Sequence, residues 1–358
     1  MKKFIYKSSL FVVPFVFLHF LNSFYYLQNE GDLTRLGYLY NNSLPKSDIS
    51  KQFNLNKHYT LVSEINLNTK TKFDVLTIGD SFSEQDSLGY KNFLAKDGTS
   101  ILHVDRFLAE NPIQKIIELI NGDFFDSVQT NYVVLQSVER SFVQRCQKID
   151  YSKSLYLDSI KNKISKHVHK TPEKHELNFF SDANLKIPLT NIQYNFSYKP
   201  RNSKTYKVTT NKDNLFTKKL NNVLFYEDDI NNMTFKNDSL KIVNSNNTLN
   251  KINNLLSKKN IKLIVLISPD KYDLYYPYIK EKANFKKPLF FKYYNNLSKE
   301  YSSIDSFEIL ASFIANHKDV YYYDDTHWSP IGASVIAIEV NKTINEIKAR
   351  THNNVYKK

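Results

Sequence analysis

Residues 73–83 have the sequence FDVLTIGDSFS, in which an apolar run ends at Ile78 and Gly79, Asp80 and Ser81 follow at once. A short apolar run closed by a turn residue is typical of a buried strand. The chain has only 7 glycines in 358 residues, so Gly79 indicates a backbone demand such as a positive φ angle or a close approach. We therefore predict a strand that ends here and presents Ser81 at the edge of a sheet.

Further apolar runs continue this pattern along the chain. Buried strands are predicted at residues 73–78, 100–104, 132–138, 261–268 and 320–323. Helical patterns lie between and after them, at residues 111–121, 249–259, 289–301, 307–317 and 329–348. Short apolar strands that alternate with helices favour a mostly parallel sheet covered on both faces. The predicted fold is therefore a three-layer α/β/α domain, with its active site at the carboxyl ends of the strands.

A second polar motif, DDTHWSP at residues 324–330, directly follows the last predicted strand. A serine hydroxyl becomes a useful nucleophile when a histidine takes its proton and a carboxylate orients that histidine. We predict Ser81 as the nucleophile and His327 as the general base. Either Asp325 or Asp324 can supply the carboxylate, since both are on the same loop as the histidine.

The tetrahedral intermediate of acyl transfer also needs hydrogen-bond donors for its oxyanion. The backbone N–H of Ser81 is one candidate, and Gln136 and Arg140, which end the third predicted strand, are others. Trp328 is the only tryptophan and is next to the predicted base. It is expected either to line the pocket and stack on a sugar or to pack in the core.

The N-terminus has the pattern of a membrane anchor. Lys2, Lys3 and Lys7 precede an uncharged, Phe- and Leu-rich stretch at residues 8–27, long enough to cross a bilayer. The lysines favour a cytoplasmic N-terminus and an extracytoplasmic body. We predict an uncleaved, single-pass signal anchor, with a cleavable signal peptide or a buried helix as the alternatives.

The composition limits the partners and cofactors. The net charge of +13 fits attraction to an acidic polymer or a membrane surface, or simply many solvated lysines, and no nucleic-acid motif accompanies it. Cys146 is the only cysteine, which excludes an intrachain disulfide and disfavours a thiolate metal site. His167, His169 and His175 are interpreted as parts of a solvated loop, so no metal or cofactor is predicted.

The predicted organisation has five parts. Residues 1–27 are the cytoplasmic tip and anchor, 28–70 a stalk, 71–143 with 246–350 the catalytic domain, 144–245 a basic, Asn- and Lys-rich insertion, and 351–358 a tail. The insertion is expected to be partly β and to pack beside the main sheet.

Four segments resemble a known family. Gly79-Asp80-Ser81 resembles the nucleophile motif of SGNH hydrolases, and DTHW at residues 325–328 resembles the Asp-x-His-Trp motif of the alginate O-acetyltransferase family. VVLQSVERS at residues 133–141 is similar to a strand ending in Glu-Arg in that family, and IVLISPDKYDLYY at residues 264–276 to its strand leading to Pro-x-Lys. In the alginate enzymes the histidine motif precedes the serine motif, whereas here it follows.

The resemblance implies a periplasmic enzyme that acetylates hydroxyls of a polysaccharide through a transient acetyl ester on Ser81. By the acetyltransferase pattern Asp325 would orient His327, whereas the general SGNH pattern would select Asp324. Lys271 would belong to the oxyanion or substrate site. The family's acetyl donor is a membrane-bound O-acyltransferase, which is the partner we expect beside the polysaccharide and the bilayer.

Three other functions remain compatible with these residues. A carbohydrate esterase would use the same triad with water as the acceptor, and is the first alternative. A catalytically inactive scaffold that binds polysaccharide is the second, although an intact serine and histidine argue against it. A lipase-like role ranks last because no hydrophobic lid pattern is present.

Overall fold

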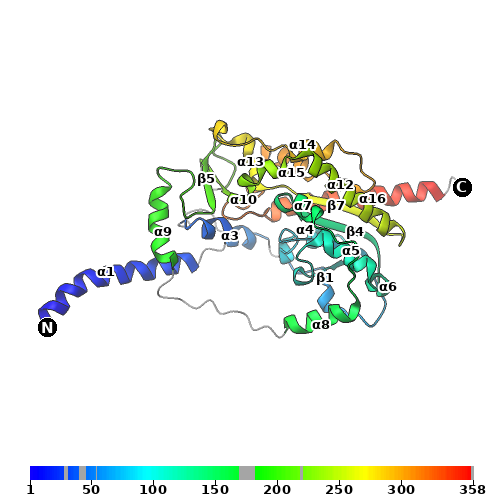
Figure 1. Cartoon of the computed structure of the whole chain (residues 1–358), viewed down its shortest axis with the longest axis horizontal. Helices are drawn as coiled ribbons and strands as arrows, with labels where there is room; N and C mark the ends of the chain where they lie inside the picture. Colours follow the sequence, from blue (N-terminus) through cyan, green and yellow to red (C-terminus); the bar gives the residue numbers. More distant parts are fainter. Residues whose placement is uncertain (28–30, 40–45, 54, 169–181, 218–220, 356–358) are drawn as a thin grey trace.

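The computed structural model describes residues 1–27, 31–39, 46–53, 55–168, 182–217 and 221–355 (Figure 1). Its centre is a six-stranded sheet in which every neighbouring pair is parallel. The strands, in spatial order, are β1 (Thr60–Leu61), β3 (Ile101–His103), β2 (Thr71–Ile78), β4 (Val128–Val138), β7 (Lys262–Ser268) and β8 (Ser302–Ile304). The predicted mixed α/β fold with a mostly parallel sheet is confirmed.

Helices cover both faces of this sheet. In β7 the side chains of Ile264 and Leu266 pack into one hydrophobic core, whereas those of Leu263, Val265 and Ile267 pack into the other. The first core includes residues of α4 (Tyr90–Lys96), α15 (Ser306–Asn316) and α16 (Pro330–Val355). The second includes residues of α5 (Pro112–Asn121), α7 (Glu139–Gln147), α12 (Ser239–Ser257) and α14 (Phe290–Asn295). Strands apolar on both faces are what a doubly covered parallel sheet requires.

One predicted strand is wrong. Residues 320–323 do not join the sheet; Tyr321 instead forms an isolated bridge with Trp328, because the chain turns back on itself between them. The strand beside β7 is β8, whose sequence Ser-Ser-Ile is too short and too polar to give an apolar signal. The hairpin-like loop made by residues 321–328 carries the Asp-His motif.

The remaining elements surround this core. They are α1 (Lys2–Leu27), α2 (Asp32–Leu36), α3 (Lys46–Lys51), α6 (Phe124–Ser127), α8 (Leu157–Val168), α9 (Asp182–Gln193), α10 (Glu227–Asn231), α11 (Met233–Lys236) and α13 (Lys271–Tyr275), with 3₁₀ turns at Val62–Glu64, Asp86–Leu88, Arg106–Leu108, Tyr276–Tyr278 and Lys282–Asn284. An antiparallel pair, β5 (Thr205–Thr209) with β6 (Asn222–Tyr226), is separate from the main sheet. The proposed boundaries of stalk, insertion and catalytic domain stay predictions.

The N-terminal helix extends away from the body of the protein (Figure 1). Its segment Lys2–Leu21 is long and apolar enough to cross a membrane, and none of that segment is buried against the rest of the chain. This exposure distinguishes α1 from a core helix. It is consistent with a single-pass anchor.

Gly79 is required for space rather than for a positive φ angle. A Cβ atom at this position would collide with the side chains of Ser83 and Gln136, both of which are buried. We predict that Gly79→Ala lowers the free energy of unfolding by about 1–3 kcal/mol, the usual cost of overpacking. Urea denaturation measures this loss, with Gly89→Ala as the control because its Cβ would have no neighbour nearer than 3.5 Å. Equal stability of the two variants would contradict the steric argument.

Candidate active site

The turn that carries Ser81 is held by the buried carboxylate of Asp80. This carboxylate accepts hydrogen bonds from Arg145 Nη1 (2.5 Å), the backbone N–H of Val138 (2.7 Å), the backbone N–H of Phe82 (3.1 Å) and Gln136 Nε2 (3.0 Å). Burial alone would raise the pKa of Asp80, but the Arg145 guanidinium and these N–H groups hold it below its ordinary value. Asp80 therefore connects the end of β2 to the end of β4 and fixes the serine between them.

The loop that carries His327 is held by Lys271, the first residue of α13. Its buried ammonium group donates to the carbonyls of Tyr322 (2.7 Å), Tyr323 (2.7 Å) and Asp325 (3.3 Å). Burial lowers the pKa of Lys271 to about 7, against the opposing effect of Asp324 and Asp325. Lys271 does not line the cavity beside Ser81. Its donors are used by the loop carbonyls, and a role at the oxyanion or substrate stays a prediction.

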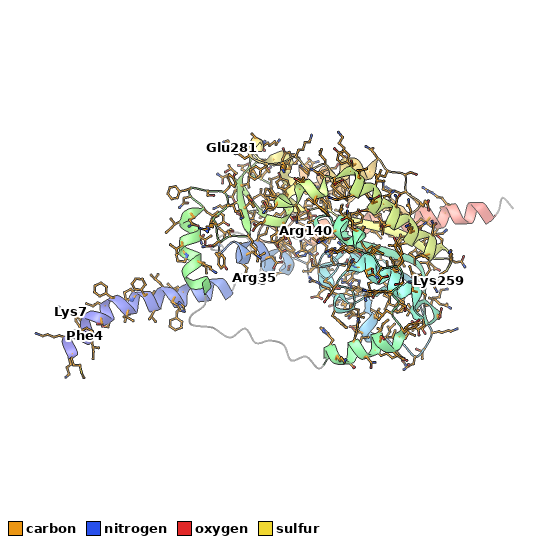
Figure 2. All side chains as sticks on the ribbon, in the orientation of Figure 1. Phe4, Lys7, Arg35, Arg140, Lys259 and Glu281 are labelled. Atoms are coloured by element: carbon orange, nitrogen blue, oxygen red, sulfur yellow. The ribbon has the colours of Figure 1, made fainter. Side chains whose placement is uncertain are left out.

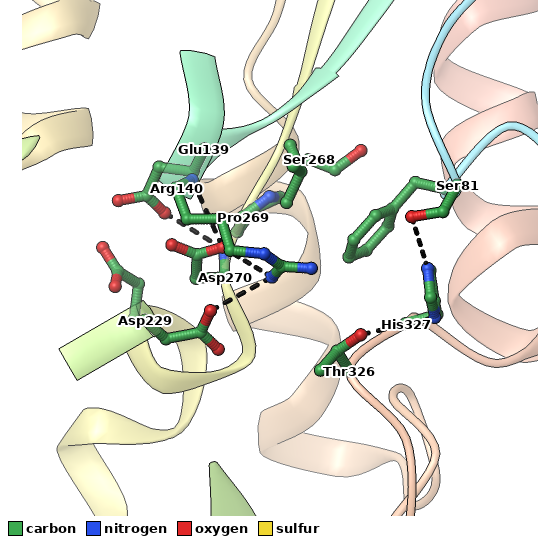
Figure 3. Close-up of polar contacts among 12 residues, drawn as sticks. Ser81, Glu139, Arg140, Asp229, Ser268, Pro269, Asp270, Thr326 and His327 are labelled. Atoms are coloured by element: carbon green, nitrogen blue, oxygen red, sulfur yellow. Dashed lines mark hydrogen bonds and ion pairs between the residues drawn. The ribbon is translucent and has the colours of Figure 1, made fainter. Parts of the chain in front are cut away.

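These two loops bring the predicted serine, histidine and aspartate together in the order expected for a triad. His327 Nε2 lies 2.8 Å from Ser81 Oγ, and His327 Nδ1 lies 2.6 Å from Asp325 Oδ1 (Figure 3 shows the serine–histidine pair). The Asp325 carboxylate also accepts the backbone N–H of His327 at 3.1 Å, which orients it towards the ring. This geometry lets a proton pass from the hydroxyl to the imidazole.

Asp324 occupies a different position from Asp325. Its side chain is fully buried and interacts electrostatically with Lys271. Its backbone carbonyl accepts the N–H of Leu33, in α2, at 2.9 Å. Of the two alternatives, it is Asp325 whose carboxylate is bonded to the imidazole.

A polar cavity of about 410 Å³ opens beside the serine and histidine. Its walls come from six separate regions of the sequence: Asp32, Leu36, Ser81, Arg106, Arg140, Ser141, Gln144, Tyr226, Asp228, Asn232, Thr326 and His327. Most of these residues are not among those predicted from the sequence. Arg106 comes just after β3, a position at a strand end that could have suggested it, whereas nothing in the sequence marks Asp32 or Asp228.

Arg140 is the only one of the four predicted oxyanion or substrate side chains that lines this cavity. Its Nη1 donates to Asp229 at 3.0 Å and to Asp270 at 3.1 Å. Figure 3 shows the other end of the guanidinium directed towards Ser81 and His327. Two anchored carboxylates thus hold one end of a cation while the other end remains directed towards the hydroxyl.

Gln136 and Trp328 do not line the cavity, so the oxyanion role of Gln136 stays a prediction, and Trp328 takes the core-packing alternative. Gln136 is fully buried, and its Nε2 donates to Asp80 and to Ser268 Oγ (2.9 Å), which uses both N–H groups. Trp328 is fully buried and packs edge-on against Phe82, with ring centroids 4.9 Å apart. Both residues pack behind the two loops, and neither lines the cavity.

Two groups of acidic and histidine side chains have the spacing of metal ligands. Glu139, Asp270 and Asp273 surround the ammonium of Lys236, whose Nζ lies 3.2, 2.5 and 3.2 Å from their oxygens. In the other group, of Asp32, Asp325 and His327, both ring nitrogens are already hydrogen-bonded. Neither group is therefore assigned to a metal.

The expected histidine loop is only partly covered by the structure. His167 stacks on Phe107 with ring centroids 4.0 Å apart, whereas His169 and His175 lie outside the described residues.

Comparison with known families gives one match. Residues 222–356 match the family described as ALGX, an SGNH hydrolase-like domain of the acetyltransferase AlgX. This region contains the His327 loop, and the match confirms the resemblance to the alginate O-acetyltransferase family. No curated protein and no solved structure matches the chain.

The buried Asp80–Arg145 pair predicts a pH-dependent stability. We expect Arg145→Met to lower the free energy of unfolding by about 3–5 kcal/mol at pH 7, since it leaves a buried charge without its partner. The depressed pKa of Asp80 contributes stability that is present above its unfolded value and lost as the pH falls through its folded value. The deficit of the variant should therefore shrink below about pH 4.

Urea unfolding at pH 7 and below pH 4 measures this effect. Lys342→Met is the control, because it removes an ion pair to Glu339 whose lysine side chain is 61% exposed and should cost little at either pH. A deficit of the Arg145 variant that is independent of pH would contradict the role given to Asp80.

Proposed function

We propose that this chain is a membrane-anchored, extracytoplasmic O-acetyltransferase that acts on hydroxyls of a cell-surface or exported polysaccharide. The observation that carries the proposal is the hydrogen-bonded series Ser81–His327–Asp325, with 2.8 and 2.6 Å between the bonded atoms. The match of residues 222–356 to the AlgX acetyltransferase domain supports acetyl transfer as the reaction.

In the first step Ser81 Oγ attacks the carbonyl carbon of an acetyl ester while His327 Nε2 takes the hydroxyl proton. The tetrahedral intermediate collapses, the bond to the donor's oxygen breaks, and the imidazolium returns the proton to that leaving group. In the second step a sugar hydroxyl gives its proton to His327 and attacks the acetyl-serine. Ser81 regains its proton as the acetylated sugar leaves, and Asp325 stabilises the imidazolium in both steps.

Two groups are positioned to stabilise the oxyanion. The backbone N–H of Ser81 has no acceptor among the residues that the structure describes, so it is available to a ligand. Arg140 adds a fixed positive charge from the cavity wall. Donors held in place before the reaction are more effective than mobile ones, because they need no reorganisation.

The cavity suits a carbohydrate acceptor. Hydroxyl, amide, carboxylate and guanidinium groups dominate its lining, and such groups can hydrogen-bond several sugar hydroxyls at once. The acetyl group would come from a membrane-bound O-acyltransferase or from another ester. Anchoring through α1 would raise the effective concentration of the enzyme at such a donor.

Acetyl transfer predicts an acetylated sugar. We expect the purified chain, given an activated acetyl ester and an oligosaccharide acceptor, to form O-acetylated oligosaccharide, detected by mass spectrometry. Ser81→Ala should reduce the rate by about 10⁴-fold or more. Ser141→Ala is the matched control, since it removes another serine hydroxyl from the same cavity without touching His327.

Two results would contradict the proposal. Release of acetate with no sugar product, at every acceptor concentration, would favour the esterase alternative. Equal rates for Ser81→Ala and the unchanged chain would exclude acyl-serine chemistry altogether.

The position of Arg140 on the cavity wall predicts that its guanidinium stabilises the oxyanion. We expect Arg140→Met to lower kcat by about 10²–10³-fold, the usual effect of losing one oxyanion donor. Because this change also leaves Asp229 without its 3.0 Å cation partner, the double variant Arg140→Met/Asp229→Asn serves as the control. It should recover thermal stability but not activity, and recovery of both would show that Arg140 acts only on the fold.

A further inference from the structure

Helix α9 carries an exposed apolar stripe that nothing in the catalytic site uses. Leu189, Ile192 and Phe196 are 59%, 58% and 87% exposed, and their spacing places them on one side of the helix and its C-terminal extension. The opposite side, with Ile187 and Thr190, is buried against the fold. A large apolar stripe on a helix that is otherwise docked indicates a partner surface.

The position of α9 identifies that surface. α9 contacts the N-terminal helix α1, and Figure 1 shows it lying crosswise to α1 rather than along it. A helix that crosses another helix running along the bilayer normal lies in the plane of the membrane. This is the orientation of an interfacial amphipathic helix.

The charges that follow α9 fit the same partner. Arg201 and Lys204 are exposed just beyond Phe196. Basic side chains next to an apolar stripe are attracted to the negative surface of a membrane that contains anionic lipid. An apolar stripe bordered by cations suits the headgroup layer better than it suits an acidic or purely apolar protein surface.

The chain also limits how far the active site can be from the membrane. Asp32 lines the cavity and is five residues after Leu27, the end of α1, so at most about 18 Å of extended chain separates them. The link is docked firmly: Leu33 N donates to the carbonyl of Asp324, and Gly31 packs so closely on that residue that a Cβ would collide with it. Figure 2 shows Arg35, on α2, between α1 and Arg140.

We propose that the stripe of Leu189, Ile192 and Phe196 inserts into the headgroup layer of the bilayer that α1 enters, and so holds the Ser81 cavity close to the membrane surface. This inference rests on the anchoring part of the proposed function and goes beyond it. The consequence is geometrical, since two contacts, α1 and α9, fix the orientation of the domain where a single helix would leave it free to rotate.

Site-directed fluorescence in full-length protein reconstituted into phosphatidylcholine–phosphatidylglycerol vesicles tests this. Burial raises the pKa of the Cys146 thiol to about 12, so the native cysteine stays unlabelled and the unchanged chain is the blank. Single labels are placed at Ile192→Cys and Phe196→Cys, with Val12→Cys in α1 as the membrane reference and Leu240→Cys on α12, 75% exposed, as the water reference.

We expect labels at 192 and 196 to be quenched by nitroxide lipids and protected from iodide, as at 12, with the opposite result at 240. Labels at 192 and 196 that iodide quenches would overturn the proposal. Protection from both quenchers would also overturn it, by showing a protein cover such as a second copy. A label at position 12 that iodide quenches would show that α1 does not enter the bilayer, which would also overturn the proposal. No readout uses catalysis, so failure of the proposed acetyl transfer would leave these outcomes distinguishable.

Discussion

The position of the candidate nucleophile depends on one buried negative charge. The Asp80 carboxylate is taken out of water, which is costly unless every oxygen lone pair finds a partner. It finds them in three places: the N–H of Val138 at the end of β4, Arg145 on α7, and the N–H of Phe82 just beyond the serine. The serine turn therefore cannot move without breaking bonds to the sheet.

Hydrogen bonds from a buried side chain fix the other half of the site as well. Residues 320–328 form no strand of the main sheet, so their carbonyls need donors from elsewhere in the fold. Lys271, placed at the end of β7 by the sheet, supplies three such bonds from a fully buried position. A buried carboxylate at one strand end and a buried lysine at another hold the hydroxyl and the imidazole 2.8 Å apart. Catalysis by preorganised groups depends on this kind of rigidity.

The sequence could predict most of the buried strands and the polar motifs that follow them. It could not predict which way the side chains after each strand end would point. The apolar runs of β2, β4 and β7 are unambiguous, because strands buried on both faces need such runs. β8 could not be found, since three residues with two serines carry no periodic signal. Arg140, Gln136 and Lys271 are equally plausible pocket residues by type and position. Only the bonds in the folded chain separate Arg140, which lines the cavity, from the other two.

Two charged residues from the segment that precedes α12 help to hold Arg140 in place. Asp229 and Lys236 come from that region, and they join a buried cluster whose other members are Glu139, Arg140, Asp270 and Asp273. Carboxylates outnumber cations in the cluster, and burial together with mutual repulsion raises the pKa values of Glu139 and Asp229. Arg140 is therefore held by carboxylates from two separate segments, and its orientation towards Ser81 depends in part on the region around residue 229 folding against the sheet.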